Sequence, residues 1–427
     1  MLELIGVLIS FIIILILIRF KINFGFSLII GSIILSIFAL AVLNEPLDVA
    51  DAFSKAIIYS FQEQKFYFET LELAILMTLI FILAKIMQVT GSIEKLINSL
   101  RGFFKRGGTL GVIPAIYGLM PVPGGAYFSV PSIDKEGDKY KLSKDQKNFL
   151  NVWFRHIWFP IYPISSAMIL ICSIEFSNID IFHLIIANIP GFIAFILIGL
   201  IFLKIFIKKN GKDELVENKN KSGLIFLIPP LIPFLIYFSI YIIGFSDIKN
   251  YQIEIFIIGV IISILLMYFF IEKDINEYLK LIKKCVSFKL AFAILGIMIF
   301  REIFTVSNAD QALANYISVL PFHPIIIVIL IPMILGLLTG YNLGAIALSY
   351  FLVEPFFEFT SLNIIGLTSI IFMSSLVGYL VSPIHLCNVV SSEYLKTDTT
   401  RMYKMYIPAV TMLLAVQIIF IYLFYMK

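Results

Sequence analysis

Two apolar stretches with a broken centre decide how this chain folds: TLGVIPAIYGLMPVPGGAYFSVP at 109–131 and IIIVILIPMILGLLTGYNLGAIALSY at 325–350. Pro and Gly interrupt each stretch, and both residues end or break α-helices. A helix that breaks inside a bilayer exposes N–H and C=O groups that lipid cannot satisfy, so they must face protein, water or a ligand. Each stretch is therefore a re-entrant hairpin or a broken span, and in either case a candidate binding element.

The two stretches resemble each other. Ile113-Pro114-x-x-x-Gly118-Leu119 precedes the first break, and Ile331-Pro332-x-x-x-Gly336-Leu337 precedes the second. Further on, Phe159-Pro160-Ile161 is matched in the same order by Ser382-Pro383-Ile384. The common order and the nearly constant offset indicate an internal repeat. The charged, aperiodic segment 204–221 is the natural linker between the two halves.

The composition requires a lipid environment. The chain has 427 residues, of which 60% are hydrophobic and 14% charged, and its mean hydropathy is +0.99. A soluble domain carries roughly 25% charged residues. The net charge of +4 does not indicate nucleic-acid binding. The three cysteines show neither CxxC nor Cys/His spacing, so we expect free thiols, no metal site and no cofactor.

Ten segments are long and apolar enough to cross a bilayer, which takes about 20 residues. The apolar run at the start of the chain follows Glu3 and lacks a cleavage site, so we interpret it as a span and not a signal peptide. The ten segments are 4–20, 24–43, 68–89, 148–172, 183–203, 223–244, 253–271, 288–305, 364–390 and 405–426.

The distribution of positive charge favours hairpins over broken spans. If 109–131 and 325–350 return to the side they entered, the cytoplasmic segments hold 25 of the 32 Lys and Arg, as the positive-inside rule requires. Five spans per half then invert the second half relative to the first. We therefore predict an all-α polytopic protein of the cell membrane with two inverted-topology repeats, each of about five transmembrane helices and one hairpin. The first repeat is 1–203, the second is 222–427, and both termini are extracellular.

The hairpin tips supply the first candidate site residues. In the first tip these are Pro123, Gly124, Gly125 and, just beyond it, Ser129, whose hydroxyl could be a ligand. The alternative is a purely structural role, in which these residues kink a helix and allow close packing. In the second tip they are Thr339, Gly340, Asn342 and Gly344. Asn342 is expected to bind a ligand, against the alternative of a helix-packing hydrogen bond.

The segments after the hairpins supply the others. In 148–172, prolines predict an unwound helix around Pro160, with Arg155 and His156 just before it. Arg155 either snorkels to the interface or points inward, where its guanidinium fits a carboxylate or phosphate. In 364–390, Ser382, His385 and Asn388 surround the matching break. His156 and His385 are candidate proton carriers, and Pro160 and Ser382 mark carbonyl-rich breaks suited to an ion.

Four motifs carry a resemblance to a known family: MPVPGGAYFSVP (120–131), RHIWFPIYP (155–163), TGYNLGAIALSY (339–350) and SPIHLCNVVSSEYLKTD (382–398). Together they resemble an uncharacterised prokaryotic membrane-protein family of the ion transporter superfamily, which includes gluconate and citrate permeases and dicarboxylate/sodium symporters. The resemblance implies a scaffold and a moving transport domain in each half, and a homodimer. The Ser-Asn-Thr hairpin signature of the dicarboxylate branch is absent, which removes the basis for assigning that substrate.

We expect a secondary transporter of a small organic anion, coupled to H⁺ or Na⁺ by alternating access, in contact with membrane lipid and with no nucleic-acid partner. Inverted repeats with matched broken helices are typical of such proteins. The alternatives are an ion channel and an intramembrane enzyme acting on lipid or peptide. No catalytic residue is assigned, because HExxH and DDxxD are absent from the sequence and only Ser165 or Ser166 near His156 could form a catalytic couple.

Overall fold

The computed structural model describes residues 2–43, 45–101, 103–104, 107–119, 125–207, 221–245, 247–315 and 323–427. Eight helical segments of this part of the chain are long and apolar enough to cross a membrane, and a ninth is counted if the bent pair 289–306 and 309–315 forms one span. The prediction of an all-α polytopic membrane protein is therefore confirmed. Within these residues the strands are limited to one short hairpin, β1 (Tyr59–Ser60) with β2 (Lys65–Phe66).

The longer helices are those of the apolar segments predicted from the sequence. They are α1 (Leu2–Arg19), α2 (Phe24–Leu43), α4 (Glu69–Val89), α10 (Ile181–Phe206), α11 (Ile228–Ile243), α12 (Gln252–Ile271), α14 (Lys289–Val306), α18 (Ile364–Val381) and α20 (Tyr403–Phe424).

The remaining helices of the described chain are shorter. They are α3 (Pro46–Ile57), α5 (Ser92–Arg101), α6 (Thr109–Gly118), α7 (Ala126–Lys139), α8 (Lys144–Arg155), α9 (Ser166–Cys172), α13 (Ile275–Cys285), α15 (Ala309–Asn315), α16 (Ile325–Thr339), α17 (Asn342–Val353), α19 (Leu386–Leu395), and the 3₁₀ turns η1 (Ser222–Leu227), η2 (Ile248–Tyr251), η4 (Glu354–Phe359) and η5 (Thr399–Met402).

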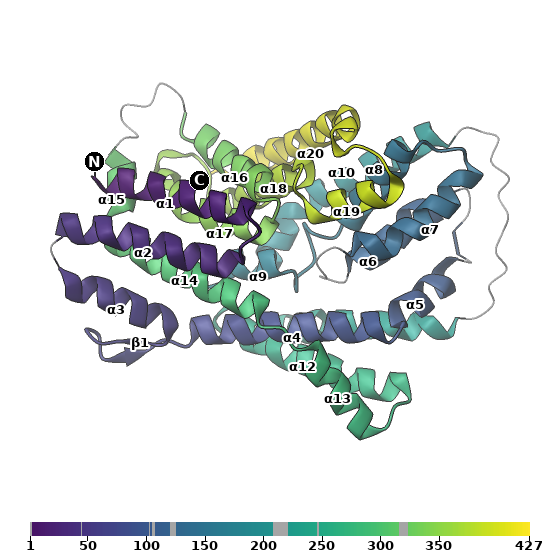
Figure 1. The fold of residues 1–427 in the computed structure, drawn as a ribbon, viewed down its shortest axis with the longest axis horizontal. Helices are drawn as coiled ribbons and strands as arrows, with labels where there is room; N and C mark the ends of the chain where they lie inside the picture. The colour runs from purple at the N-terminus through teal and green to yellow at the C-terminus, as the bar shows by residue number, and fades with distance from the viewer. Residues whose placement is uncertain are drawn as a thin grey trace.

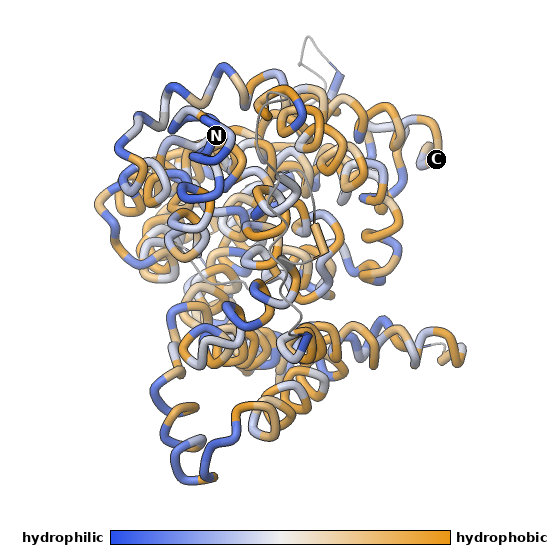
Figure 2. The backbone as a smooth tube through the Cα atoms, turned by 90° about the vertical axis from the view of Figure 1, so that its right-hand side faces the viewer, coloured by the Kyte–Doolittle hydropathy of each residue, from blue (hydrophilic) through white to orange (hydrophobic). Residues whose placement is uncertain are grey.

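The outer surface of the helices is apolar. Figure 2 shows hydrophobic residues predominating along the helical tube. On α1, for example, Ile5, Leu8, Ile12 and Ile16 form an exposed stripe at helical spacing. Large exposed apolar side chains are stable when lipid or a partner surface covers them. This surface is the one expected of helices in contact with lipid.

Each interrupted apolar stretch forms two short helices. The first gives α6 and α7, which contact each other, and the second gives α16 and α17, which also contact each other. At about 1.5 Å per residue, none of the four reaches the roughly 30 Å of a bilayer core. In the second stretch, Gly340 takes φ = +59° and its N–H bonds the carbonyl of Gly336 at 3.0 Å, which ends α16. Glycine favours that φ, and a Cβ there would also lie 2.8 Å from Cγ1 of Ile384, so the close packing is what glycine allows at this position.

The glycine of each I-P-x-x-x-G-L motif lies against the backbone of the helix that follows the hairpin, α8 in the first half and α18 in the second. A Cβ at Gly118 of α6 would collide with the carbonyl of Arg155 in α8, and a Cβ at Gly336 of α16 would collide with the carbonyl of Ser375 in α18. Small residues allow such close backbone approach between membrane helices. Corresponding glycine contacts therefore allow α6 to pack closely on α8 and α16 to pack closely on α18.

Other contacts join distant parts of the chain crosswise. Helix α7 packs on α19 while α17 packs on α9, and α2 packs on α14 while α4 packs on α12. Figure 1 shows α4 and α12 running together along the lower side, below α6, α9 and α17. Each of these short helices thus lies against a short helix of the other half, α7 against α19 and α9 against α17.

The predicted span 148–172 is not one helix. Helix α8 ends at Arg155 and α9 begins only at Ser166, where the Ser165 hydroxyl accepts from the Met168 N–H at 3.3 Å. Pro160 and Pro163 lie in between and cannot donate an N–H. The break is thus longer than a proline kink, and it begins at His156. In the corresponding segment of the second half, residues 382–385 separate α18 from α19.

Buried amides hold the first break in place. The Asn188 side chain on α10 donates to the Pro160 carbonyl at 2.9 Å and accepts from Ser369 on α18 at 2.7 Å. Gln417 on α20 donates to Ser369 at 2.7 Å and accepts the N–H of Gly191 at 2.9 Å. Such a network is stable in a membrane only because its members satisfy one another.

Candidate functional site

The candidate site is built around Arg155, the last residue of α8. Its side chain is 4% exposed, so it points into the protein and does not snorkel to an interface. The guanidinium lies against Gly125, the N-cap of α7, where a Cβ would fall within 2.6 Å of Cζ. The first N–H groups of a helix lack intrahelical partners and carry partial positive charge. Arg155 and the start of α7 therefore form one electropositive region.

The tip between α16 and α17 meets the second break. A Cβ at Gly340 would lie 3.0 Å from the backbone N of His385, and the Ser382 hydroxyl donates to the Leu337 carbonyl at 2.7 Å. His385 is the N-cap residue of α19 and is fully buried. The second tip and the second break thus form a single structural unit.

The two breaks meet through aromatic and imidazole rings. The rings of His156 and His385 are 4.8 Å apart, and the ring of Tyr379 is 3.9 Å from that of His385. His156 Nδ1 lies 2.6 Å from the Val152 carbonyl, and its Nε2 lies 3.2 Å from the Tyr379 hydroxyl. A carbonyl can only accept, so Nδ1 carries the proton and the Nε2 lone pair faces Tyr379.

Amides and hydroxyls continue the polar core on either side. On one side, Ser129 of α7 donates to Asn151 of α8 at 2.6 Å, and Asn151 donates to Ser391 of α19 at 3.0 Å. On the other side, Ser375 of α18 donates to the side-chain oxygen of Asn342 at 2.8 Å. All five side chains are buried.

Several polar atoms of this core make no hydrogen bond to a described residue. They are Nδ2 of Asn342, both ring nitrogens of His385, and both amide atoms of Asn388. A buried polar atom without a partner costs roughly 1–3 kcal/mol, and such atoms mark places where water or a ligand completes the bonding. The core therefore has the donors and acceptors of a binding site.

The other predicted site residues have different surroundings. Pro123 and Gly124 lie outside the described residues. Thr339 donates to the Leu335 carbonyl of its own helix at 2.7 Å. Gly344 faces the Phe24 ring of α2. These contacts, like those of Pro160 and Ser382, position the backbone around the core.

Sequence reasoning overlooked Asn151, Ser375, Tyr379, Ser391 and Cys387. The signals were present but unspecific: single polar residues at helical spacing within apolar segments, such as Asn148 with Asn151. A cavity of about 610 Å³ lies beside the first break, but its lining is almost wholly apolar and includes Ile157 and Trp158. Its chemistry suits hydrocarbon and not a charged ligand.

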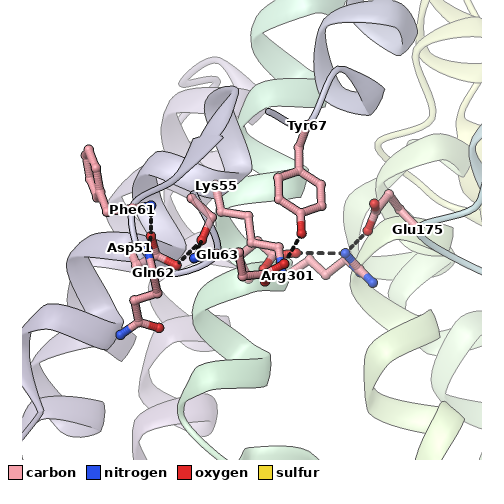
Figure 3. Close-up of polar contacts among 10 residues, drawn as sticks. Asp51, Lys55, Phe61, Gln62, Glu63, Tyr67, Glu175 and Arg301 are labelled. Carbon is pink, nitrogen blue, oxygen red and sulfur yellow. Dashed lines mark hydrogen bonds and ion pairs between the residues drawn. The ribbon is translucent and has the colours of Figure 1, made fainter. Parts of the chain in front are cut away.

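A second polar cluster lies away from this core, around α14 (Figure 3). Arg301 on α14 pairs with Glu175, in the segment after α9, and with Glu302 at 2.8 Å. Nearby, Lys55 pairs with Glu63 at 2.8 Å, and Tyr67 donates to the same carboxylate. The Arg301 pair therefore ties α14 to the α9–α10 connection, and the Lys55 pair ties α3 to the β1–β2 hairpin.

Comparison with known families covers nearly the whole chain. The model of a family described as protein of unknown function (DUF401) matches residues 2–424. The chain belongs to this family. No curated protein matches the chain. The family is thus uncharacterised, and the core around Arg155 has to be interpreted from its own chemistry.

Proposed function

We propose that this protein is a secondary active transporter of a small organic anion of the carboxylate class, coupled to H⁺ or Na⁺ through alternating access. The observation that carries the proposal is the burial of Arg155 between the start of α7 and the meeting point of two helix breaks. A buried arginine in a membrane protein is a functional group by default. Its planar fork suits a carboxylate.

The donor set supports an anion as cargo. The N–H groups of the first turn of α7 lie beside the guanidinium, and Nδ2 of Asn342, which makes no hydrogen bond to a described residue, is a further buried donor of the core. Helix N-termini and charge-assisted hydrogen bonds stabilise anions. In the coupling step, His156 or His385 would carry a proton, or backbone carbonyls at the breaks near Pro160 and Ser382 would coordinate Na⁺.

Paired contacts support an architecture of two inverted repeats, 1–203 and 222–427, joined by 204–221. The α7–α19 contact has its counterpart in α17–α9, and the α2–α14 contact in α12–α4. The two glycine contacts, Gly118 on α8 and Gly336 on α18, also correspond. Reciprocal pairs of this kind are what a pseudo-twofold axis would produce. The moving part would contain the two hairpins and the two broken helices.

The resemblance to the ion transporter superfamily, with its gluconate and citrate permeases and dicarboxylate/sodium symporters, supports the same function. With it we propose a homodimer in the cell membrane with both termini outside. The exposed apolar faces leave room for lipid and for a second subunit. The positive charge of 204–221 supports a cytoplasmic position for that linker.

The rival functions make different demands. An intramembrane hydrolase would need a nucleophile near His156; the Ser165 hydroxyl caps α9, and the nucleophile that lies close to this histidine is the buried thiol of Cys387. A channel would pass its ion only down the gradient of that ion. Neither rival accounts for an arginine at the junction of two matched breaks.

A binding titration tests the site directly. The chain's two tryptophans, Trp153 and Trp158, flank Arg155 in sequence, so their fluorescence reports on the site. Purified protein is titrated with mono-, di- and tricarboxylates, phosphate and sugar acids, with and without Na⁺ and at several pH values. We expect a saturable change with at least one carboxylate that Arg155→Met abolishes. A response to none of them, or an unchanged response in the variant, contradicts the proposal.

A further inference from the structure

We propose that His156, His385 and Cys387 form a binding site for a transition-metal ion of the Zn²⁺ type. One potential ligand atom from each of these three residues lies within 4.8 Å of the others, and all three side chains are buried. Nitrogen and sulfur ligands select Zn²⁺ and related ions over Mg²⁺ and Ca²⁺. Binding of this ion goes beyond anion transport, and a bound ion would occupy the two histidines proposed above as proton carriers.

The geometry needs only a small contraction. Zn–N distances of about 2.0–2.1 Å and a Zn–S distance of about 2.3 Å place tetrahedral ligand atoms roughly 3.3–3.6 Å apart. A pair separated by the full 4.8 Å would therefore close by about 1.2–1.5 Å. His385 can rotate without breaking a hydrogen bond to a described residue, because neither of its ring nitrogens makes one.

The surroundings of His156 match those of a metal-binding histidine. Its Nδ1–H donates to the Val152 carbonyl at 2.6 Å, which fixes the ring and leaves Nε2 as the ligand atom. Metal-bound histidines commonly donate their other N–H to a carbonyl in this way. The Tyr379 hydroxyl, 3.2 Å from Nε2, would have to turn away on binding.

The three ligands leave one coordination position of the ion open, and their charge bears on what fills it. Binding releases the Cys387 thiol proton, so one thiolate and two neutral imidazoles would leave a net charge of about +1 on a divalent ion. Three protein ligands leave the fourth position free for water or an anion. The positive Arg155 next to His156 makes an anionic fourth ligand the more favourable one.

The ligands come from both halves of the chain. His156 begins the break after α8, and His385 and Cys387 lie at the start of α19. A bound ion would therefore cross-link the two breaks, hold α8 against α19 and restrict their relative movement.

Cobalt titration of the metal-free, full-length protein in detergent tests the site. A tetrahedral Co²⁺–thiolate complex absorbs in the visible and near ultraviolet, so we expect these bands to appear with one Co²⁺ per chain and to disappear on adding Zn²⁺. Mg²⁺ should neither produce nor displace them. Cys387→Ser should remove the thiolate band, and His385→Gln should weaken binding by at least about 100-fold, because losing a ligand costs more than losing one of its outer-shell partners. The matched controls, Cys172→Ser and Cys285→Ser, remove the other two buried free thiols and should change nothing.

A second measurement needs no variant. Zn²⁺ should slow alkylation of Cys387, read by mass spectrometry of the wild-type protein, and leave Cys172 and Cys285 unaffected. Absence of saturable Co²⁺ or Zn²⁺ binding, or binding that survives both substitutions, overturns the proposal. Neither measurement uses an anion gradient, so a metal site without transport and transport without a metal site give different results.

Discussion

Gly125→Ala is predicted to damage the anion site without removing any of its charged groups. Gly125 has φ = −59° and ψ = −13°, which alanine adopts without strain. The new Cβ would overlap one terminal nitrogen of the Arg155 guanidinium, and would lie 2.6 Å from Cζ and 2.9 Å from the other terminal nitrogen. Favourable contacts between heavy atoms are about 3.5–4.0 Å, so the guanidinium must retreat by more than about 1 Å.

A displacement of that size has a measurable consequence. Misplacing a positioning group by about 1 Å costs on the order of 100-fold in function, equivalent to about 2.7 kcal/mol. We expect the Kd of the carboxylate found in the binding titration to rise by about that factor, with protein yield and melting temperature unchanged. Tryptophan fluorescence measures the Kd.

A double-mutant cycle shows whether the effect passes through Arg155. Once Arg155→Met has removed the guanidinium, Gly125→Ala should add almost nothing. Gly111→Ala is the matched control, because its Cβ would crowd the Phe154 ring at 3.1 Å and not Arg155. It should leave the Kd within about threefold of wild type. A wild-type Kd for Gly125→Ala, or additive effects in the cycle, refutes the reasoning.

Three further predictions concern stability, each measured as a change in the free energy of unfolding in detergent. Gln417→Leu removes the acceptor of the buried Gly191 N–H and should cost about 1–3 kcal/mol; a variant as stable as wild type would show that the network is dispensable. Gly336→Ala forces a Cβ onto the α18 backbone and should also cost about 1–3 kcal/mol; an unchanged value would contradict the close α16–α18 packing. Arg301→Gln breaks the partly buried pair with Glu175 and should cost only about 1 kcal/mol. A much larger loss of stability would contradict the interpretation of this pair as a weak, partly exposed ion pair.

The helices were predictable from the sequence because apolar run length is set by the bilayer itself. Eight of the ten predicted spans are helices close to their predicted bounds, as at 24–43, where α2 has the same limits. The segments 148–172 and 364–390 are each divided into two helices; hydropathy alone cannot show such a break, and it was the prolines that predicted one in each segment. Both are apolar, and both are broken where proline removes a backbone donor.

The contacts of the site could be predicted only in part. Arg155, His156, His385 and Asn342 stood out because polar groups are rare in apolar segments. Their partners did not, because the contacts depend on how the halves pack: Asn151 and Ser391 are 240 residues apart in sequence. The same reason explains why sequence spacing gave no hint of the group formed by the two histidines and Cys387.

Gradient-driven uptake into proteoliposomes tests the central claim most directly. Radiolabelled carboxylates are supplied outside under an inward H⁺ gradient, an inward Na⁺ gradient, or neither. The account predicts that one carboxylate accumulates above its external concentration under one of the two gradients, that an ionophore abolishes the accumulation, and that Arg155→Met prevents it. Uptake that never exceeds equilibrium, or that Arg155→Met leaves unchanged, would contradict it.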